Sequence, residues 1–251
     1  MPHCINTAEN IGIVLVGGPS TSTSFRPLGL QTPKSLFPIC DKPILEHQLR
    51  WLAKSGLFSH LFVLGFFENQ PFDSFIQKLD SEITVPVKYL REYENLGTAG
   101  GMYHFRDVLL RSKPKRMLVF NSDTMTLFNL HELVAFHDRN KSDFTIVCSQ
   151  VKPEQAANFG AIVVDSTGNG KVRHFVEKPH SFISNTVNCG IYMMNANVMN
   201  FIGEQYRLNE KNSERPQFMM FERDIIPALL EMHSIYAFSD ILYWKLVKTP
   251  R

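Results

Sequence analysis

Short apolar runs alternate with amphipathic segments through the first half of the chain. Residues 11–16 (IGIVLV) form a continuous run rich in β-branched side chains that ends at Gly17-Gly18, which is typical of a strand buried on both faces of a parallel sheet. Pro43 then opens a stretch with apolar residues at helical spacing. The same pattern predicts further strands at 61–65, 85–90 and 117–120, and helices at 72–79 and about 99–110. Strands that alternate with helices of this length indicate successive βαβ units.

The second half of the chain consists of shorter apolar runs. Residues 167–170 (TGNG) form a strong turn signal between two of them. Strands are predicted at 144–149, 161–164, 172–176, 190–194 and 241–247, and helices at 195–205 and 221–232. We therefore expect one α/β domain over residues 1–251, with a mixed, mostly parallel sheet and helices on both faces. A βαβ half at about 11–125 would precede a more antiparallel half at about 126–251.

Charge and the lengths of the apolar runs exclude several classes of protein. The 26 Lys and Arg residues nearly balance 24 Asp and Glu residues, so no basic field implies a nucleic-acid partner. The longest apolar runs, near 11–16 and 61–67, are far shorter than the ~20 residues of a membrane helix, and the first ten residues show no signal-peptide pattern. The cysteines lack paired metal spacing and are Cys4, Cys40, Cys148 and Cys189. We expect a cytoplasmic protein with reduced thiols and no membrane partner.

The loop after the first strand, GGPSTSTSFRPLGLQTPKS, is the first candidate for chemistry, because open α/β sheets bind ligands beyond the carboxyl ends of their strands. Gly17 and Gly18 let the backbone approach a ligand closely, and Arg26 and Lys34 could meet phosphates. An ordinary polar loop with surface cations explains these residues equally well. The loop matches neither the P-loop pattern nor the dinucleotide fingerprint.

A series of short motifs resembles the sugar-nucleotide pyrophosphorylases, a family of nucleotidyltransferases. The loop is similar to the family signature GGxGTRLRPLT followed by PKP. In the family's order come residues 96–101 (LGTAGG), 121–123 (NSD), 158–160 (NFG), 177–179 (EKP) and 188–192 (NCGIY). Each motif is weak alone, but the ordered series is specific. GGP instead of GGxG, FRPL and YHFRD at 103–107 resemble most the alpha-type homologues of mannose-1-phosphate guanylyltransferase. The resemblance implies a Rossmann-like nucleotide-diphospho-sugar transferase fold.

The family condenses a nucleoside triphosphate with a sugar 1-phosphate and releases pyrophosphate, so its members mainly position two anions for in-line attack. The resemblance implies that the first half binds nucleotide, through Gly17, Gly18, Leu96, Gly97, Thr98 and Gly100. A helix beginning near Ala99 would bring amide groups to this site. A tight strand-to-helix turn is the alternative explanation for the glycines. Lys34 and Arg26 match positions near the phosphates, although a lone lysine is often only a surface residue.

The resemblance assigns the sugar phosphate to the second half, through Gly160, Glu177, Lys178 and Asn188. A solvated surface pair is the alternative for Glu177 and Lys178. Asp123 follows the apolar run MLVF, where the family holds magnesium with an aspartate, since a hard cation needs carboxylate oxygen. Its alternative role is to cap the next segment.

Three departures from the family pattern concern catalysis. The triplet GTR is Ser22-Thr23-Ser24 here, so Ser24 replaces an arginine, and one neutral hydroxyl cannot replace a cation with five donors. Arg26 matches a different family arginine. PKP is PKS, which keeps Lys34. The segment Trp-x-Asp-x-Gly corresponds to residues 244–248 (WKLVK), which places Leu246 where the second magnesium ligand is expected. Magnesium would then be bound weakly or not at all.

Three hypotheses follow. The first is a regulatory homologue that binds GDP-mannose but is catalytically impaired, as a partner of a catalytic beta-type guanylyltransferase. The second is an active enzyme that joins GTP and mannose 1-phosphate, with Asp123 and Lys34 in the reaction. The third is a structural module with a vestigial pocket. Relatives of this type continue into a left-handed β-helix of hexapeptide repeats, which this sequence lacks, so we also expect a fragment or a short form.

Overall fold

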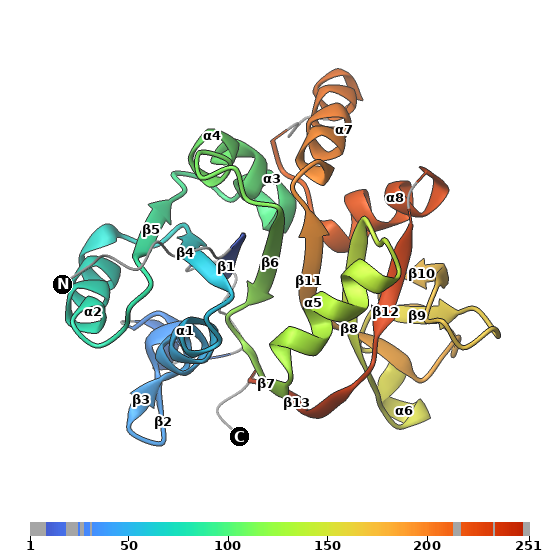
Figure 1. Ribbon diagram of the computed structural model, residues 1–251, viewed down its shortest axis with the longest axis horizontal. Helices are drawn as coiled ribbons and strands as arrows, with labels where there is room; N and C mark the ends of the chain where they lie inside the picture. Colours follow the sequence, from blue (N-terminus) through green and yellow to red (C-terminus); the bar gives the residue numbers. More distant parts are fainter. Residues whose placement is uncertain are drawn as a thin grey trace.

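The computed structural model describes residues 9–18, 25, 28–30, 32–212, 217–232 and 234–247. Its centre is a sheet of nine strands in which seven follow the order β10-β9-β11-β6-β1-β4-β5, and β8 and β12 extend it beside β11. The strands of the first half pair in parallel, and β11 runs antiparallel to β6. Figure 1 shows the parallel strands on the left and the more antiparallel strands on the right. The expected mixed α/β fold is confirmed.

The main sheet contains β1 (Asn10–Gly17), β4 (Phe58–Gly65), β5 (Val87–Arg91), β6 (Arg116–Asn121), β8 (Phe144–Gln150), β9 (Ala161–Val164), β10 (Val172–Val176), β11 (Thr186–Asn195) and β12 (Ile235–Phe238). Two small sheets pair β2 (Pro38–Ile39) with β3 (Lys42–Pro43) and β7 (Thr124–Phe128) with β13 (Ile241–Leu246). The α-helices are α1 (Ile44–Lys54), α2 (Asn69–Asp80), α3 (Gly97–His104), α4 (Arg106–Leu109), α5 (Leu130–Arg139), α6 (Pro153–Ala156), α7 (Val198–Asn212) and α8 (Ile226–Met232). Short turns are the 3-10 helices η2 (Leu28–Leu30) and η3 (Lys34–Leu36) and the π-helix η4 (Phe221–Ile225).

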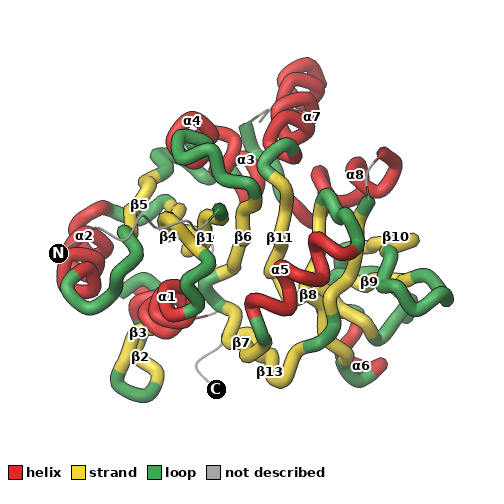
Figure 2. The backbone as a smooth tube through the Cα atoms, viewed as in Figure 1, coloured by secondary structure: helices red, strands yellow, loops and turns green. Residues whose placement is uncertain are grey.

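Alternating side chains of the central strands enter two hydrophobic clusters. In β6, Met117 and Val119 belong to one cluster, whereas Leu118 and Phe120 belong to the other, because successive side chains of a strand point to opposite faces. The first cluster draws on α3, α4, α7 and α8, and the second on α1, α2 and α5. Helices therefore cover both faces of the sheet, as expected, and Figure 2 shows them in red around the yellow strands. None of the described helices combines the length and apolar composition needed to cross a bilayer.

Several elements differ from the sequence prediction. The helix expected at about 99–110 is interrupted at Phe105 and forms α3 and α4, and the helix expected at 195–205 runs over α7. The sequence analysis did not predict β7, α5 or β12. The four-residue strand β12 exists because it pairs in parallel with β8, and such a distant partner is not visible in a local hydrophobic pattern.

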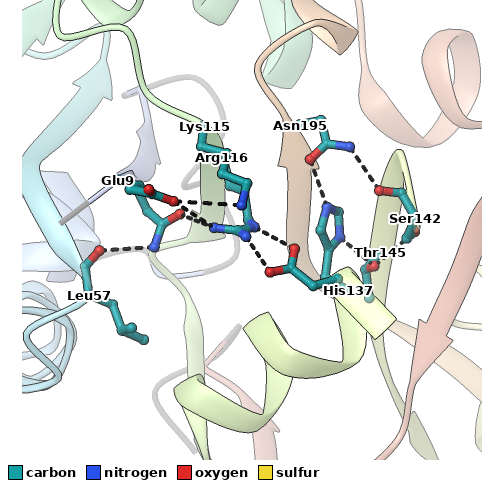
Figure 3. Close-up of polar contacts among 10 residues, drawn as sticks. Glu9, Leu57, Lys115, Arg116, His137, Ser142, Thr145 and Asn195 are labelled. Carbon is teal, nitrogen blue, oxygen red and sulfur yellow. Dashed lines mark hydrogen bonds and ion pairs between the residues drawn. The ribbon is translucent and has the colours of Figure 1, made fainter. Parts of the chain in front are cut away.

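A buried polar cluster joins the two halves at the edge where β6 begins. Arg116 is 4% exposed and donates hydrogen bonds to both carboxylate oxygens of Asp138 in α5 and to Oδ1 of Asn10 in β1. Beside it, His137 contacts the Thr145 hydroxyl at 2.8 Å and Oδ1 of Asn195 at 3.1 Å. Figure 3 shows these contacts in a row across β6, α5, β8 and β11. Because each buried polar group has partners, the cluster ties α5 to the sheet without orphaned groups.

Candidate functional site

A cavity of about 280 Å³ opens at the carboxyl ends of β1, β4 and β6. Ligands bind at this edge in open α/β sheets. The sequence-predicted residues that line this first cavity are Gly17, Gly18, Lys34, Gly97, Thr98 and Asp123. The structure thus brings together residues from three separate sequence motifs, the loop after the first strand, residues 96–101 and residues 121–123.

Lys34 and Asp123 form an ion pair inside the first cavity. The Lys34 ammonium lies 3.0 Å from Oδ2 of Asp123, and the two side chains are 14% and 26% exposed. The buried Gln48 of α1 stabilises the turn that carries Asp123, because its amide donates to the carbonyl of Thr124 at 2.8 Å. Partial burial strengthens the attraction between the two charges relative to a surface pair. Lys34 is therefore more than a surface lysine.

The start of α3 is fastened to residues 217–220 by its backbone. The amides of Ala99 and Gly100 both donate to the carbonyl of Met219, at 3.0 and 3.2 Å. A Cβ on Gly97, whose φ is +75°, would lie 2.3 Å from that carbonyl oxygen, and a Cβ on Gly100 would lie 2.2 Å from the carbonyl oxygen of Gln217. Both glycines therefore permit close contact between two backbone segments.

Because of these backbone contacts, only part of the predicted nucleotide motif lines the first cavity. Gly97 and Thr98 line the first cavity, but Leu96 and Gly100 line a different groove beside Tyr103. The expectation that amides near Ala99 face a ligand is wrong for Ala99 and Gly100, because both amides are bonded to Met219. The turn packs against the 217–220 segment, as the alternative explanation expects, and it also borders the first cavity. Nucleotide binding by the glycine motif stays a prediction.

Glu92 is a lining residue that the sequence analysis missed. It follows β5 directly and is 7% exposed, and its carboxyl group lies against α3 where only a glycine fits, at Gly101. Burial raises the pKa of Glu92 to about 7, although a hydrogen bond from the Leu96 backbone opposes this shift. Its position at the end of a predicted strand was the available signal. A buried carboxyl group that titrates near neutrality is a candidate functional group.

A second cavity of about 140 Å³ adjoins the first and shares Asn121 and Asp123 with it. All four residues predicted to hold a sugar phosphate line it, namely Gly160, Glu177, Lys178 and Asn188. The Lys178 ammonium lies 4.0 Å from Oε1 of Glu177, and its side chain is 59% exposed. Lys178 also has a left-handed backbone, with φ +47°, and such strain in a non-glycine residue is found disproportionately at ligand sites.

A chain of side-chain hydrogen bonds connects the two cavities. The Asn188 amide donates to the Tyr192 hydroxyl at 2.8 Å, which in turn donates to Oε1 of Glu222 at 2.9 Å. The Thr98 hydroxyl donates to Oε2 of Glu222 at 3.3 Å. Tyr192 is fully buried, and this burial raises the pKa of its hydroxyl well above the ordinary value. Tyr192 stands in the motif at 188–192 but was not predicted as a site residue. Glu222 belongs to none of the motifs, and the hydrophobicity pattern of a helix does not show where a carboxylate points.

The second-cavity lining includes Leu246 of β13, close to Asp123. The Val247 amide donates to the Asp123 carbonyl at 2.8 Å, and the Trp244 indole donates to the Cys189 carbonyl at 3.3 Å. Pairing of β13 with β7 thus puts the hydrocarbon side chain of Leu246 in the wall of the second cavity, at the position where the sequence resemblance predicts a second carboxylate. In the described residues, no group of three or more His, Cys, Asp or Glu side chains is arranged to hold a metal ion. One carboxylate already paired with a lysine does not fit magnesium held by two protein carboxylates.

Two residues predicted near the phosphates, Ser24 and Arg26, lie outside the described residues. Their roles stay predictions of the sequence.

Comparisons with known proteins agree with this geometry. A family model described as nucleotidyl transferase matches residues 11–247. A Schizosaccharomyces pombe protein named "Probable mannose-1-phosphate guanyltransferase" is 36% identical over 94% of this chain and 60% of its own length. A Danio rerio protein named mannose-1-phosphate guanylyltransferase regulatory subunit alpha-B is 32% identical over 94% of this chain and 59% of its own length. The chain thus spans about 60% of the length of these curated relatives.

The fold also matches solved structures. A Bacillus anthracis crystal structure in complex with sucrose superposes with a TM-score of 0.79 at 18% identity, over 96% of this chain and 91% of that one. HddC from Yersinia pseudotuberculosis superposes with a TM-score of 0.69 at 20% identity, over 96% and 94% of the two chains. The architecture is shared at identities too low to transfer a substrate. The nucleotidyl transferase model matches residues 11–247, a range that includes the residues lining both cavities. The chain therefore belongs to the nucleotidyl transferase family.

Proposed function

We propose that this chain binds a nucleotide sugar across the two adjoining cavities and has little transferase activity of its own. The observation that carries the proposal is the position of Asp123, which lines both cavities, is paired with Lys34 and lies beside Leu246. A nucleotide in the first cavity and a sugar in the second would place the diphosphate that joins them at Asn121 and Asp123. Lys34 and Lys178 supply positive charge on either side of that position.

Weak catalysis follows from what the transfer step requires. A sugar-phosphate oxygen attacks the α-phosphorus of the triphosphate, a new P–O bond forms, and pyrophosphate leaves with the electrons of the broken bond. The transition state needs cations around the transferred group, and here Ser24 stands where an arginine is expected and Leu246 where a carboxylate would hold magnesium. Loss of a transition-state arginine alone costs about 10³–10⁵ in turnover.

The base would be guanine because of Glu92. Its buried carboxyl group lines the nucleotide cavity, and a carboxylate accepts hydrogen bonds only. Guanine presents two adjacent donors, the N1–H and the exocyclic amino group, whereas uracil and thymine present a single donor between two acceptors. In its ionised form, Glu92 would therefore favour guanine over uracil and thymine in this cavity.

Mannose as the sugar and a regulatory role are supported by the names of the relatives, several of which are called regulatory alpha subunits of mannose-1-phosphate guanylyltransferase. The partner that these names suggest is a catalytic beta-type guanylyltransferase. Within this proposal, the βαβ half holds GDP and the more antiparallel half holds mannose.

The alternative is an active GTP:mannose-1-phosphate guanylyltransferase. Lys34 and Asp123 are both retained in the cavity, and the Schizosaccharomyces pombe relative is named as a guanyltransferase. A vestigial pocket that binds nothing is the third possibility.

Two measurements on the purified chain separate these functions. We expect calorimetry to detect GDP-mannose binding, and a pyrophosphate assay with GTP, mannose 1-phosphate and magnesium to detect no turnover above the uncatalysed rate. Turnover that Asp123→Ala abolishes would show the chain to be an enzyme. Absence of binding to GDP-mannose, UDP-glucose and ADP-glucose alike would show that the pocket is vestigial.

A further inference from the structure

Glu222 is a buried carboxylate between the two cavities that no sequence motif includes. It lies in the π-helix η4 and is 9% exposed. None of the ion pairs in the described part of the chain includes it. A buried anion without a cation has to be stabilised by hydrogen bonds. The two donors that supply them come from opposite halves of the chain.

On the side of the second cavity, the donor is Tyr192. Its hydroxyl donates to Glu222 and accepts from the Asn188 amide. Asn188 in turn accepts from the Gly190 amide at 2.8 Å, so both ends of its side chain have partners. Asn188 also forms part of the wall of the second cavity, and its side-chain amide keeps a further N–H and a further lone pair that a ligand could use. A ligand that binds Asn188 therefore acts directly on the hydrogen bond from Asn188 to the Tyr192 hydroxyl.

On the side of the first cavity, the donor is Thr98. Its hydroxyl donates to Glu222 and accepts from the Phe221 amide at 2.9 Å. Thr98 lies in the first turn of α3 and lines the first cavity. The bonds from Ala99 and Gly100 to Met219 hold the same turn against the segment that leads into Glu222. The Glu222 carboxylate therefore contacts this turn directly through the Thr98 hydroxyl, and a shift of the carboxylate would act on that bond.

We propose that Glu222 couples the two cavities, so that a sugar phosphate bound at Asn188 raises the affinity of the first cavity for the nucleotide. The ligand orders Asn188 and Tyr192, which fixes the Glu222 carboxylate and with it the Thr98 turn, so that the nucleotide loses less conformational freedom when it binds. This inference rests on the proposed function, because it takes a nucleotide and a sugar phosphate as the two ligands. Glu222 acts here as a positioning residue.

The test is a binding cycle with GMP and mannose 1-phosphate, which together fill both cavities without a covalent link. Calorimetry gives the Kd of GMP alone and with saturating mannose 1-phosphate, and the ratio of the two is the coupling factor. Repulsion between the two phosphates lowers this factor equally in every variant, so the comparison between variants isolates Glu222. We expect the wild-type factor to exceed that of Glu222→Gln by about fivefold or more, within the usual range of coupling between sites.

Matched variants separate positioning from folding. The two hydroxyls bond different oxygens of Glu222, and glutamine keeps the size of the side chain but replaces one of these oxygens with an NH2 donor, so one hydroxyl loses its acceptor at that position. Glu231→Gln removes the same charge from an exposed position of α8 and should keep the wild-type factor. Thr98→Ser, which retains the hydroxyl, should keep it as well, whereas Thr98→Val should lose it. The Thr98 pair also tests the proposal if Glu222→Gln fails to fold.

A second readout follows the amides themselves. In the wild type, mannose 1-phosphate alone should slow hydrogen exchange at residues 97–102, and in Thr98→Val it should not. A wild type that binds both ligands but has the same coupling factor as Glu222→Gln and Thr98→Val would overturn the coupling and leave the proposed function standing. A wild type that binds neither ligand would overturn both.

Discussion

The Lys34 ammonium lies 3.0 Å from Oδ2 of Asp123, at the wall common to the two cavities. The sequence resemblance predicts magnesium at this carboxylate, and Leu246 lines the adjoining cavity where the resemblance predicts a second ligand. In the structure the ammonium group of Lys34 is paired with Asp123. In the proposed complex, this ammonium group would supply positive charge from the protein itself to a bound diphosphate.

Removal of divalent metal should leave nucleotide-sugar binding unchanged. Because Lys34 supplies the charge at Asp123, we expect the Kd of GDP-mannose in EDTA to lie within twofold of the value in magnesium. Lys34→Met should weaken binding by about tenfold or more, since it leaves the Asp123 carboxylate to repel the diphosphate. Calorimetry in the two buffers measures both effects, and a fivefold loss in EDTA would contradict this account.

Restoring one catalytic residue should not restore turnover. Ser24→Arg supplies a cation but leaves Leu246 in place, and Leu246→Asp supplies a carboxylate but leaves Ser24. We expect pyrophosphate release only from the double variant, and only with magnesium, because groups that act on one transition state are not additive. Ser22→Arg, two positions earlier in the same loop, is the matched control. Robust turnover by Ser24→Arg alone would show that the second carboxylate is dispensable.

Glu92 should make guanine binding depend on pH. The pKa of Glu92 is about 7 in the folded chain, so the acceptor carboxylate is lost as pH falls through 7. The affinity for GDP should therefore decrease from pH 8 to pH 6. Glu92→Gln should remove most of this dependence and reduce the preference for GDP over UDP by about tenfold, the effect of one lost pair of donor–acceptor contacts. Equal pH profiles for wild type and Glu92→Gln would exclude Glu92 from base recognition.

His137 should make the fold less stable in mild acid. Burial lowers the pKa of His137 below its ordinary value near 6.5, so the unfolded chain binds a proton more readily than the folded chain. The stability that this residue contributes is present above pH 6.5 and is lost as pH falls toward the lowered pKa, by up to about 1.4 kcal/mol per pH unit. Urea unfolding at pH 7.5 and 5.5 measures the loss.

The comparison needs a reference variant, because Glu92 acts with the opposite sign. Its pKa is raised, so its unfavourable burial is relieved as pH falls below 7. The effect of His137 is therefore the difference between wild type and His137→Gln, in which only the titrating ring is removed. If both proteins lose the same free energy of unfolding between the two pH values, the ring is not the cause.

Gly97→Ala should be more harmful than a substitution at an equally left-handed glycine. Gly97 has φ +75° and Gly168 has φ +76°. A Cβ on Gly97 would lie 2.3 Å from the Met219 carbonyl oxygen, whereas a Cβ on Gly168 would meet open space. We expect Gly168→Ala to cost about 1–2 kcal/mol from backbone strain. Gly97→Ala should cost a further 1–3 kcal/mol, roughly, from the clash. Thermal unfolding of the two variants gives the difference directly.

The sequence contained most of the fold because its buried strands are short, apolar and bounded by turns. The features that the sequence pattern did not predict depend on contacts between segments that are distant in the chain. Strand β12 forms against β8, and the buried carboxyl group of Glu222 is bonded to Thr98 and Tyr192, which are far from it in the chain. Charged residues of this kind look like surface residues in a hydrophobicity pattern. The order of the motifs identified the four sugar-phosphate candidates that line the second cavity. It could not show that Gly100 packs against the backbone of residues 217–220 instead of lining the first cavity.

Strand β11 belongs to both halves of the molecule. It pairs with β6 from Ile191 to Asn195 and with β8 from Thr186 to Met194, with a register shift between Asn188 and Tyr192, so the parallel and antiparallel strands are hydrogen-bonded into one sheet. A hinge motion that closed one cavity over the other would have to break these hydrogen bonds, in a strand whose residues are mostly buried. We therefore expect ligands to reorder side chains around the two cavities rather than to move one half of the sheet against the other.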